Sequence, residues 1–252
     1  MCFAEHDLPV ACNDAVADVG ERAAAHTDGV YLEHVVSDGE QAGHGAEGFA
    51  AEVEVEAPPR FVSRGGEKLE GAFALWGAAG LDASGKTCLD VGSSTGGFTD
   101  CLLQHGARKV MAVDVGTNQL AWSLRSDPRV WVRENFNARY MTPADLPDVP
   151  SLAVTDVSFI SLRLILPPIC GVLPPGGEVV ALIKPQFEAG RGNAPGGLVR
   201  DEAVRAAARD GIVDFATREL SLELLGLAES PVRGREKGNV EYLSYWRKGE
   251  RL

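Results

Sequence analysis

The chain has 252 residues, 45% of them hydrophobic, and a formal net charge of −12. This hydrophobic content is typical of a globular protein and excludes a largely disordered chain, and apolar runs such as Val179–Ile183 are far too short to span a bilayer. The five cysteines lack the spacing of a metal finger, and the N-terminus lacks the pattern of a signal peptide. We therefore expect a cytoplasmic protein with reduced thiols.

The negative charge is concentrated in the first part of the chain. Residues 1–59 contain thirteen acidic residues and a single basic one, Arg22, which leaves 23 of each sign for residues 60–252. This neutral remainder can still carry a local basic face. The acidity of the whole chain is therefore weak evidence against a nucleic acid partner.

Residues 1–59 are predicted to form a small acidic α+β module that ends in a linker. A helical pattern around Ala15–Ala25 precedes strand-like segments at Val30–Val36 and Ala51–Glu56, and Ala57-Pro58-Pro59 has the composition of a linker. Four histidines in this segment lack the close spacing of metal ligands, so we expect no metal: His6, His26, His34 and His44. The larger domain is predicted to cover residues 60–252.

Helices and strands alternate along the larger domain. A first helix follows Arg64, because Leu69, Ala72, Phe73 and Trp76 recur at helical spacing. Strands are then predicted at Thr87–Val91, Lys109–Val113, Val130–Arg133, Leu152–Asp156 and Glu178–Ile183, and helices at Phe98–His105, Leu162–Cys170 and Asp201–Leu220. Such alternation indicates an α/β fold, in which helices cover both faces of a Rossmann-like parallel sheet.

The end of the chain has a different pattern. Two strands are predicted at Leu222–Ser230 and Val240–Arg247, on either side of a turn at Gly234–Gly238. We therefore predict that an antiparallel hairpin closes the otherwise parallel sheet.

A glycine-rich turn between the first strand and the next helix indicates a nucleoside cofactor. Glycines in Gly92–Phe98 let the backbone turn sharply and approach a ligand, and the free N–H groups at the helix start add positive partial charge. Asp114 ends the next strand, where a carboxylate can accept both ribose hydroxyls. The Gly-x-x-x-Gly-Gly spacing differs from the dinucleotide pattern and suits a nucleoside with a methionine tail. A purely structural turn is the alternative.

Two polar residues end later strands of the predicted sheet. Asp156 ends the fourth strand and Lys184 the fifth, where Pro185 stops the strand, and ligands of open α/β sheets bind beyond these carboxyl ends. A ribose hydroxyl is a poor nucleophile until its proton is removed or shared. A lysine can take that proton where burial or a second cation favours its neutral form. Solvated strand ends with a surface ion pair are the alternative.

The order of these segments resembles one known family. Residues 60–248, about three quarters of the chain, resemble the TlyA proteins, which are FtsJ-like ribosomal RNA 2′-O-methyltransferases historically also labelled haemolysins. The matching segments are Arg60–Leu69, Asp90–Asp100, Ala112–Gly116, Asn135–Tyr140, Thr155–Leu162, Lys184–Gly190 and Gly238–Tyr242.

The resemblance implies a function and a set of site residues. It implies S-adenosylmethionine as cofactor, cytidines of ribosomal RNA or ribosomal subunits as target, and a catalytic tetrad with Lys184 as the central base: Lys68, Asp156, Lys184 and Glu241. It implies cofactor contacts at Gly92, Ser93, Gly96, Gly97, Phe98, Asp114 and Asn137.

The N-terminal segment departs from the family pattern. Family members carry a small basic RNA-binding module there, whereas thirteen acids against one base should repel phosphates, so we expect a degenerate module. Basic residues elsewhere form a candidate RNA track, each of which could equally belong to a solvated face of mixed charge: Arg60, Arg64, Arg133, Arg139, Arg191, Arg233 and Lys237.

Three other functions compete with this interpretation. A noncatalytic RNA- or ribosome-binding protein that keeps the fold is favoured by the acidic N-terminus and opposed by the intact tetrad. A membrane-lysing protein is suggested by the haemolysin label alone and lacks a transmembrane run or a basic amphipathic helix. A nicotinamide dehydrogenase is disfavoured by the glycine spacing and the terminal hairpin.

Overall fold

The structure, a computed structural model, describes residues 59–190, 192–234 and 238–249. The predicted N-terminal module and its linker lie outside these residues, apart from Pro59. So do Arg191 and Lys237 of the candidate RNA track.

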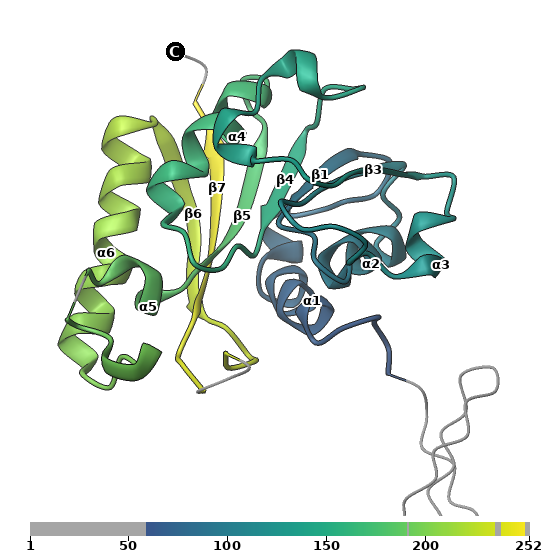
Figure 1. Cartoon of the computed structure of the whole chain (residues 1–252). Helices are drawn as coiled ribbons and strands as arrows, with labels where there is room; N and C mark the ends of the chain where they lie inside the picture. The colour runs from purple at the N-terminus through teal and green to yellow at the C-terminus, as the bar shows by residue number, and fades with distance from the viewer. Residues whose placement is uncertain (1–58, 191, 235–237, 250–252) are drawn as a thin grey trace, which may run out of the picture. The chain divides into compact units, whose positions relative to one another are not determined.

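The described chain forms a seven-stranded sheet with helices on both faces (Figure 1). The strands are β1 (Thr87–Val91), β2 (Lys109–Val113), β3 (Val130–Arg133), β4 (Leu152–Thr155), β5 (Glu178–Ile183), β6 (Leu222–Glu229) and β7 (Tyr242–Lys248). The helices are α1 (Gly65–Trp76), α2 (Gly97–Gln104), α3 (Trp122–Arg125), α4 (Leu166–Val172), α5 (Pro185–Glu188) and α6 (Glu202–Glu219). Short 3₁₀ turns lie at Gly77–Ala79, Ala138–Tyr140, Pro143–Asp145, Leu162–Leu164 and Pro195–Gly197.

The sheet order is β3-β2-β1-β4-β5-β7-β6, and the first five strands are parallel. β7 runs antiparallel to both β5 and β6 and lies between them. The predicted α/β fold and its terminal antiparallel hairpin are therefore confirmed. The insertion of β7 beside β5 places the start of β7 at the carboxyl end of β5, where Ile183 pairs with Tyr242.

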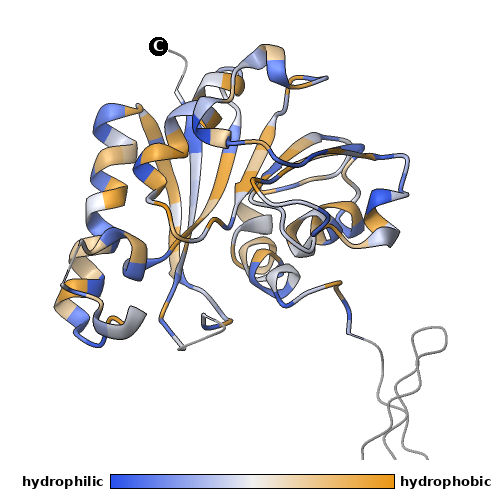
Figure 2. Ribbon diagram, in the orientation of Figure 1, coloured by the Kyte–Doolittle hydropathy of each residue, from blue (hydrophilic) through white to orange (hydrophobic). Residues whose placement is uncertain are grey.

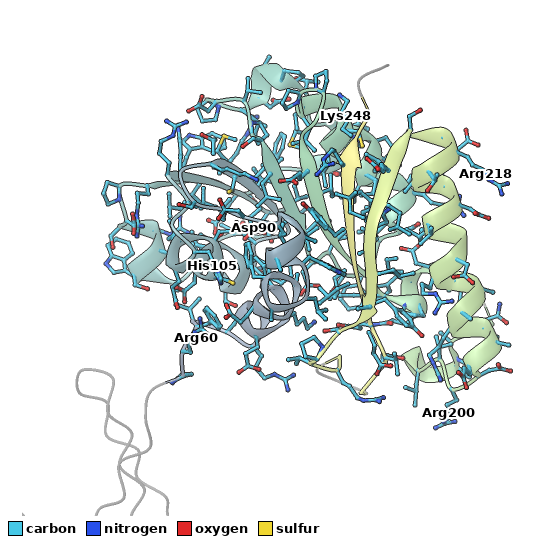
Figure 3. The ribbon with its side chains drawn as sticks, turned by 180° about the vertical axis from the view of Figure 1, so that it is seen from behind. Arg60, Asp90, His105, Arg200, Arg218 and Lys248 are labelled. Atoms are coloured by element: carbon cyan, nitrogen blue, oxygen red, sulfur yellow. The ribbon has the colours of Figure 1, made fainter. Side chains whose placement is uncertain are left out.

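Two apolar layers form the core, one on each face of the sheet. Alternate residues of the strands point to opposite faces, so Cys88 and Val110 pack against α1, α2 and α3, while Leu89 and Met111 pack against α4 and α6. Figure 2 shows the hydrophobic colour concentrated on the strands. The outer face of α6 is polar, and Arg218 points away from the sheet (Figure 3).

The structure corrects several predicted boundaries. The single helix expected over Leu162–Cys170 is divided into a 3₁₀ turn and α4, because prolines occupy the first turn of α4. A proline lacks the N–H that a helix interior requires, and it is tolerated at a helix start. β2 has the predicted bounds and β4 ends one residue earlier than expected, so Asp114 and Asp156 directly follow their strands.

Candidate active site

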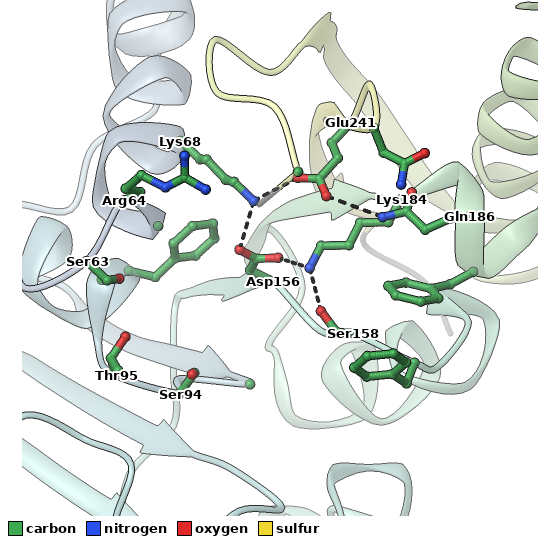
Figure 4. A pocket seen from close by; sticks show the side chains of 18 of the residues that line it. Ser63, Arg64, Lys68, Ser94, Thr95, Asp156, Ser158, Lys184, Gln186 and Glu241 are labelled. Atoms are coloured by element: carbon green, nitrogen blue, oxygen red, sulfur yellow. Dashed lines mark hydrogen bonds and ion pairs between the residues drawn. The ribbon is translucent and has the colours of Figure 1, made fainter. Parts of the chain in front are cut away.

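Four charged side chains converge beyond the carboxyl ends of β4 and β5. Asp156 directly follows β4, and Lys184 directly follows β5. Glu241 directly precedes β7, and because β7 is antiparallel, its start lies at the same edge of the sheet. Lys68 reaches this edge from the first turns of α1. The chain thus brings together residues that are up to 173 positions apart in sequence (Figure 4).

The four groups form a chain of ion pairs in which cations and carboxylates alternate. Lys184 Nζ lies 2.6 Å from Asp156 Oδ1, and Lys68 Nζ lies 3.5 Å from the other Asp156 oxygen. Lys68 also donates a 2.7 Å hydrogen bond to Glu241 Oε2. Since Lys68, Lys184 and Glu241 are buried, each charge depends on these partners for the stabilisation that water would otherwise supply.

Two neighbouring polar side chains complete this cluster. Lys184 Nζ donates a 2.8 Å hydrogen bond to the Ser158 hydroxyl, and Gln186 Nε2 donates to Glu241 Oε1 at 3.4 Å. Asp156 and Ser158 therefore hold the Lys184 amine from two sides. A restrained amine is suited to receive a proton from a hydroxyl placed beside it.

The cluster lies in a pocket of about 870 Å³ whose other wall is the glycine-rich turn. Of the predicted cofactor residues, four line this pocket: Gly92, Ser93, Gly97 and Phe98. All four tetrad residues and Arg64 line it too. The pocket is large enough for a nucleoside-sized ligand.

The glycines of the turn are required by close packing and by backbone conformation. Gly92 has φ 83°, and a Cβ there would lie 2.9 Å from Val157 Cγ1. A Cβ on Gly97 would collide with Ser63 Oγ and would lie 2.7 Å from the Gly66 amide nitrogen. Glycine at these two positions therefore lets Val157 and the start of α1 pack directly against the turn.

Asp90, labelled in Figure 3, lies in β1 two residues before Gly92 and is fully buried. The Thr99 hydroxyl donates a 2.7 Å hydrogen bond to Asp90 Oδ2, which ties the end of β1 to α2. Burial raises the pKa of the Asp90 carboxyl to about 7, with the Thr99 hydrogen bond opposing this rise and the negative charge of Asp156 adding to it. Asp90 is thus a structural group whose protonation changes near neutral pH.

The remaining predicted cofactor residues do not line the pocket. Asp114 accepts backbone hydrogen bonds from Ser94 at 2.8 Å and from Gly116 at 2.7 Å, so both of its oxygens are partly occupied. Asn137 caps the following 3₁₀ turn by accepting from the Arg139 amide. Gly96 has φ 99° and is the N-cap of α2. Each carboxylate oxygen has a second lone pair, so Asp114 can still accept from a ligand.

An exposed aromatic pair borders the pocket near Lys184. The Phe159 side chain is 85% exposed, and its ring centroid lies 5.2 Å from that of Phe187. Phe159 has φ 64°, a left-handed conformation that is rare and costly for a bulky residue. Exposure and strain together suggest that this ring serves a ligand rather than the core.

The arginines of the candidate RNA track differ in whether they are exposed without a described ion pair or paired with a carboxylate. Arg64 is exposed at the pocket, and Arg139 is exposed over the Tyr140 ring. Arg60, by contrast, pairs with Glu70 at 3.0 Å. The two others that the structure describes are also paired: Arg133 with Asp145 at 2.9 Å, and Arg233 with Glu229 at 3.4 Å.

Sequence reasoning missed Ser158, Gln186 and Phe159. All three lie within two or three residues of Asp156 or Lys184 and line the same pocket. Their position directly after a strand end that was already suspected was the available signal. Within the described residues, no helix is both long and apolar enough to cross a membrane.

Comparison with known proteins identifies the family. Residues 61–248 match the sequence model of the FtsJ-like methyltransferase family. The chain belongs to the FtsJ-like methyltransferase family. It is 51% identical over 188 residues to Bacillus subtilis YqxC, a protein provisionally named an rRNA methyltransferase, and this match covers 74% of the chain and 65% of that relative. The chain therefore spans slightly less than two thirds of that relative's length.

Two further relatives agree with this assignment. Over 199 residues the chain is 45% identical to the Mycobacterium tuberculosis protein named 16S/23S rRNA (cytidine-2′-O)-methyltransferase TlyA, with 79% of the chain and 72% of that protein covered. A crystal structure of a provisionally named haemolysin from Lactococcus lactis superposes with a TM-score of 0.72 at 52% identity, covering 76% of the chain and 90% of that protein. The resemblance to the TlyA proteins is thus confirmed.

Proposed function

We propose that this chain is an S-adenosylmethionine-dependent methyltransferase that modifies the ribose 2′-hydroxyl of ribosomal RNA, with cytidine as the target nucleoside. The observation that carries the proposal is the position of Lys184. Its amine is held by Asp156 and Ser158 inside the same pocket as the glycine-rich turn. A proton acceptor and a cofactor-sized cradle therefore share one cavity. The names of the YqxC and TlyA relatives support RNA as the substrate.

The residues of the turn fit the cofactor. We infer that the wall that would hold its methionine part is lined by Gly92, Ser93, Gly97 and Phe98, since all four border the pocket at the start of α2. We also infer that Asp114 would hold the ribose hydroxyls. The list of proposed cofactor residues is completed by Gly96 and Asn137, which shape the adjoining backbone. When bound, S-adenosylmethionine supplies a methyl group on a positively charged sulfur, which is an excellent leaving group.

The four charged residues have different parts in the proposed reaction. Lys184 takes the proton from the 2′-hydroxyl and thereby makes its oxygen a stronger nucleophile. Asp156 orients the Lys184 amine through its 2.6 Å contact. Lys68 balances the charge of Asp156, and Glu241 fixes Lys68 in turn. No group of this set acts alone, because each buried charge would be left unpaired without its neighbour.

Phe159 has a place in this proposal. RNA-modifying enzymes receive a target base that has left its stack, and such bases stack on aromatic rings. The exposed Phe159 ring at the pocket edge offers such a surface. Arg64 and Arg139 are exposed and available to contact phosphates.

We further propose that residues 60–252 form the methyltransferase domain, that residues 1–59 form a separate module, and that the protein acts on ribosomes in the cytoplasm.

Label transfer tests the proposed function. Purified protein is incubated with ribosomal subunits and S-adenosylmethionine labelled in its methyl group, and label in ribosomal RNA is counted. We expect label with the wild type and none with Lys184→Ala. Binding of the cofactor is measured by calorimetry, where Asp114→Ala should lose at least about tenfold in affinity. Cofactor binding without transfer to any RNA would favour a noncatalytic RNA-binding protein.

A further inference from the structure

Three side chains of the kinds that bind metals meet between α1 and α2, away from the pocket. Glu70, Cys101 and His105 each offer one ligand atom, and these atoms lie within 4.8 Å of one another. His105 Nε2 lies 2.7 Å from Glu70 Oε2, and Cys101 Sγ lies 3.8 Å from the same oxygen. None of the three lines the catalytic pocket. Figure 3 labels His105 beside α2.

The fold of the two helices brings these groups together. Cys101 and His105 are four residues apart at the end of α2, so they lie on the same helix face. Glu70 comes from the middle of α1, which packs against α2 through buried residues such as Leu69 and Leu102. The His105 ring stacks on Phe73 with centroids 3.9 Å apart, which fixes its plane. The cluster is therefore built on two helices rather than on a loop.

We propose that Glu70, Cys101 and His105 form a zinc site. A thiolate, an imidazole and a carboxylate are the ligands that Zn²⁺ uses in proteins. The bond lengths of tetrahedral zinc place neighbouring ligand atoms roughly 3.3–3.6 Å apart. The separations of 2.7 and 3.8 Å from Glu70 Oε2 lie on either side of that range. Shifts of less than 1 Å would bring these two contacts into the range, and Cys101 Sγ and His105 Nε2, which lie within 4.8 Å of each other, would have to approach to the same range.

Zinc can enter this site from solvent. Cys101 is buried, but the Glu70 and His105 side chains are each 29% exposed. Three protein ligands leave a fourth position that water can fill. Arg60 pairs with the other oxygen of Glu70, Oε1, at 3.0 Å, and so steadies the carboxylate without engaging Oε2. Binding through sulfur releases the thiol proton to solvent.

The consequence of binding would be structural. An ion held by Glu70 and by the end of α2 would join α1 to α2. These two helices carry Lys68 and the end of the glycine-rich turn. Spacing along the sequence gave no reason to expect a metal, because Glu70 lies 31 residues before Cys101 and only the fold makes them neighbours. A metal-free ion pair between His105 and Glu70 is the competing interpretation.

Cobalt substitution tests the site. The full chain without a tag is titrated with Co²⁺, and the thiolate-to-cobalt charge-transfer absorption is recorded. We expect this band to grow until about one equivalent and to disappear on addition of Zn²⁺, since Zn²⁺ binds N and S ligands more tightly than Co²⁺. Zn²⁺ alone should raise the melting temperature, because it binds the folded state. A wild-type protein that shows no band would overturn the proposal.

Substitutions show which side chains bind the Co²⁺ ion. Cys101→Ala should abolish the band, and His105→Gln, which changes a partly exposed side chain, should weaken Co²⁺ binding at least about tenfold while the protein stays folded. Cys170→Ala is the matched control, because Cys170 is also a buried free cysteine but lies in α4. It should leave the titration unchanged. A band that persists in folded Cys101→Ala would also overturn the proposal, since the sulfur would then come from another cysteine.

Discussion

Asp156 Oδ1 lies 2.6 Å from Lys184 Nζ. The second Asp156 oxygen faces Lys68 at 3.5 Å, so one carboxylate bridges the two lysines. Lys68 therefore affects Lys184 through Asp156. Because Lys68 neutralises part of the Asp156 charge, that charge does not act on Lys184 alone. The group proposed to take the proton, Lys184, is thus distinct from the groups that position it, and the two roles can be tested by separate substitutions.

Replacement of Lys184 should stop methyl transfer without preventing cofactor binding. Lys184→Ala removes the proton acceptor, and loss of a general base costs about 10²–10⁴-fold in rate. Lys184→Arg should fail as well, because a guanidinium keeps its proton. Single-turnover transfer and calorimetry with S-adenosylmethionine measure the two effects. Lys109→Ala is a suitable control, since Lys109 begins β2 at the opposite end of the sheet. Substantial transfer by Lys184→Arg would contradict the assignment.

Replacement of Lys68 should slow methyl transfer less than replacement of Lys184. In Lys68→Ala the charge of Asp156 acts on Lys184 alone and Glu241 loses its ion-pair partner, but the proposed proton acceptor stays in place. Lys68→Arg keeps the cation and should restore most of the rate. Single-turnover rates of the three variants test this, and a loss in Lys68→Ala as large as that in Lys184→Ala would exclude the proposed role.

Removal of the Phe159 ring should weaken RNA binding without destabilising the fold. Base–aromatic stacking contributes about 1–3 kcal/mol per base, so Phe159→Ala should bind target RNA about 5–150-fold more weakly. Phe159→Gly should lose the same binding yet keep the wild-type melting temperature, because glycine adopts φ 64° without strain. Filter binding and thermal melts are the measurements. Val149→Ala, another exposed apolar residue, is the control. Unchanged RNA affinity in both Phe159 variants would refute the stacking role.

The buried Asp90 carboxyl should make stability depend on pH. Its pKa of about 7 in the folded protein lies above the ordinary value of 3.8, so the folded state binds the proton more tightly than the unfolded chain. Its contribution is fully present below about pH 4 and is lost as pH rises through 7. Asp90→Asn lacks this loss, so its stability relative to wild type should rise by a few kcal/mol between pH 5 and 8. Denaturant melts at both pH values check this. A constant difference would mean that Asp90 ionises normally.

Much of the fold could be predicted from the sequence, because buried parallel strands are short apolar runs with clear ends. β1, β2, β3 and β5 have the predicted bounds. The four-residue helices α3 and α5 could not be predicted, since they are too short to show a helical period. The hairpin pattern also does not specify which of its strands pairs with β5.

The site was predicted less completely, for a related reason. Asp156 and Lys184 were visible as strand ends, but the position of Glu241 depends on the pairing of β7 with β5. The contact between Lys68 and Glu241 joins α1 to the last strand, and local sequence patterns carry no information on such distances. Only the resemblance to a family indicated these two residues, and their roles stay predictions.

The position of the transferred methyl group tests the central claim most directly. Ribosomal subunits are labelled by the protein from methyl-labelled S-adenosylmethionine, and the purified RNA is hydrolysed in alkali. Alkaline cleavage needs a free 2′-hydroxyl, so a methyl on that oxygen protects the adjacent phosphodiester bond. We predict that the label appears in an alkali-resistant dinucleotide whose 5′ nucleoside is 2′-O-methylcytidine. Label released in mononucleotides would place the methyl on a base and would contradict the account.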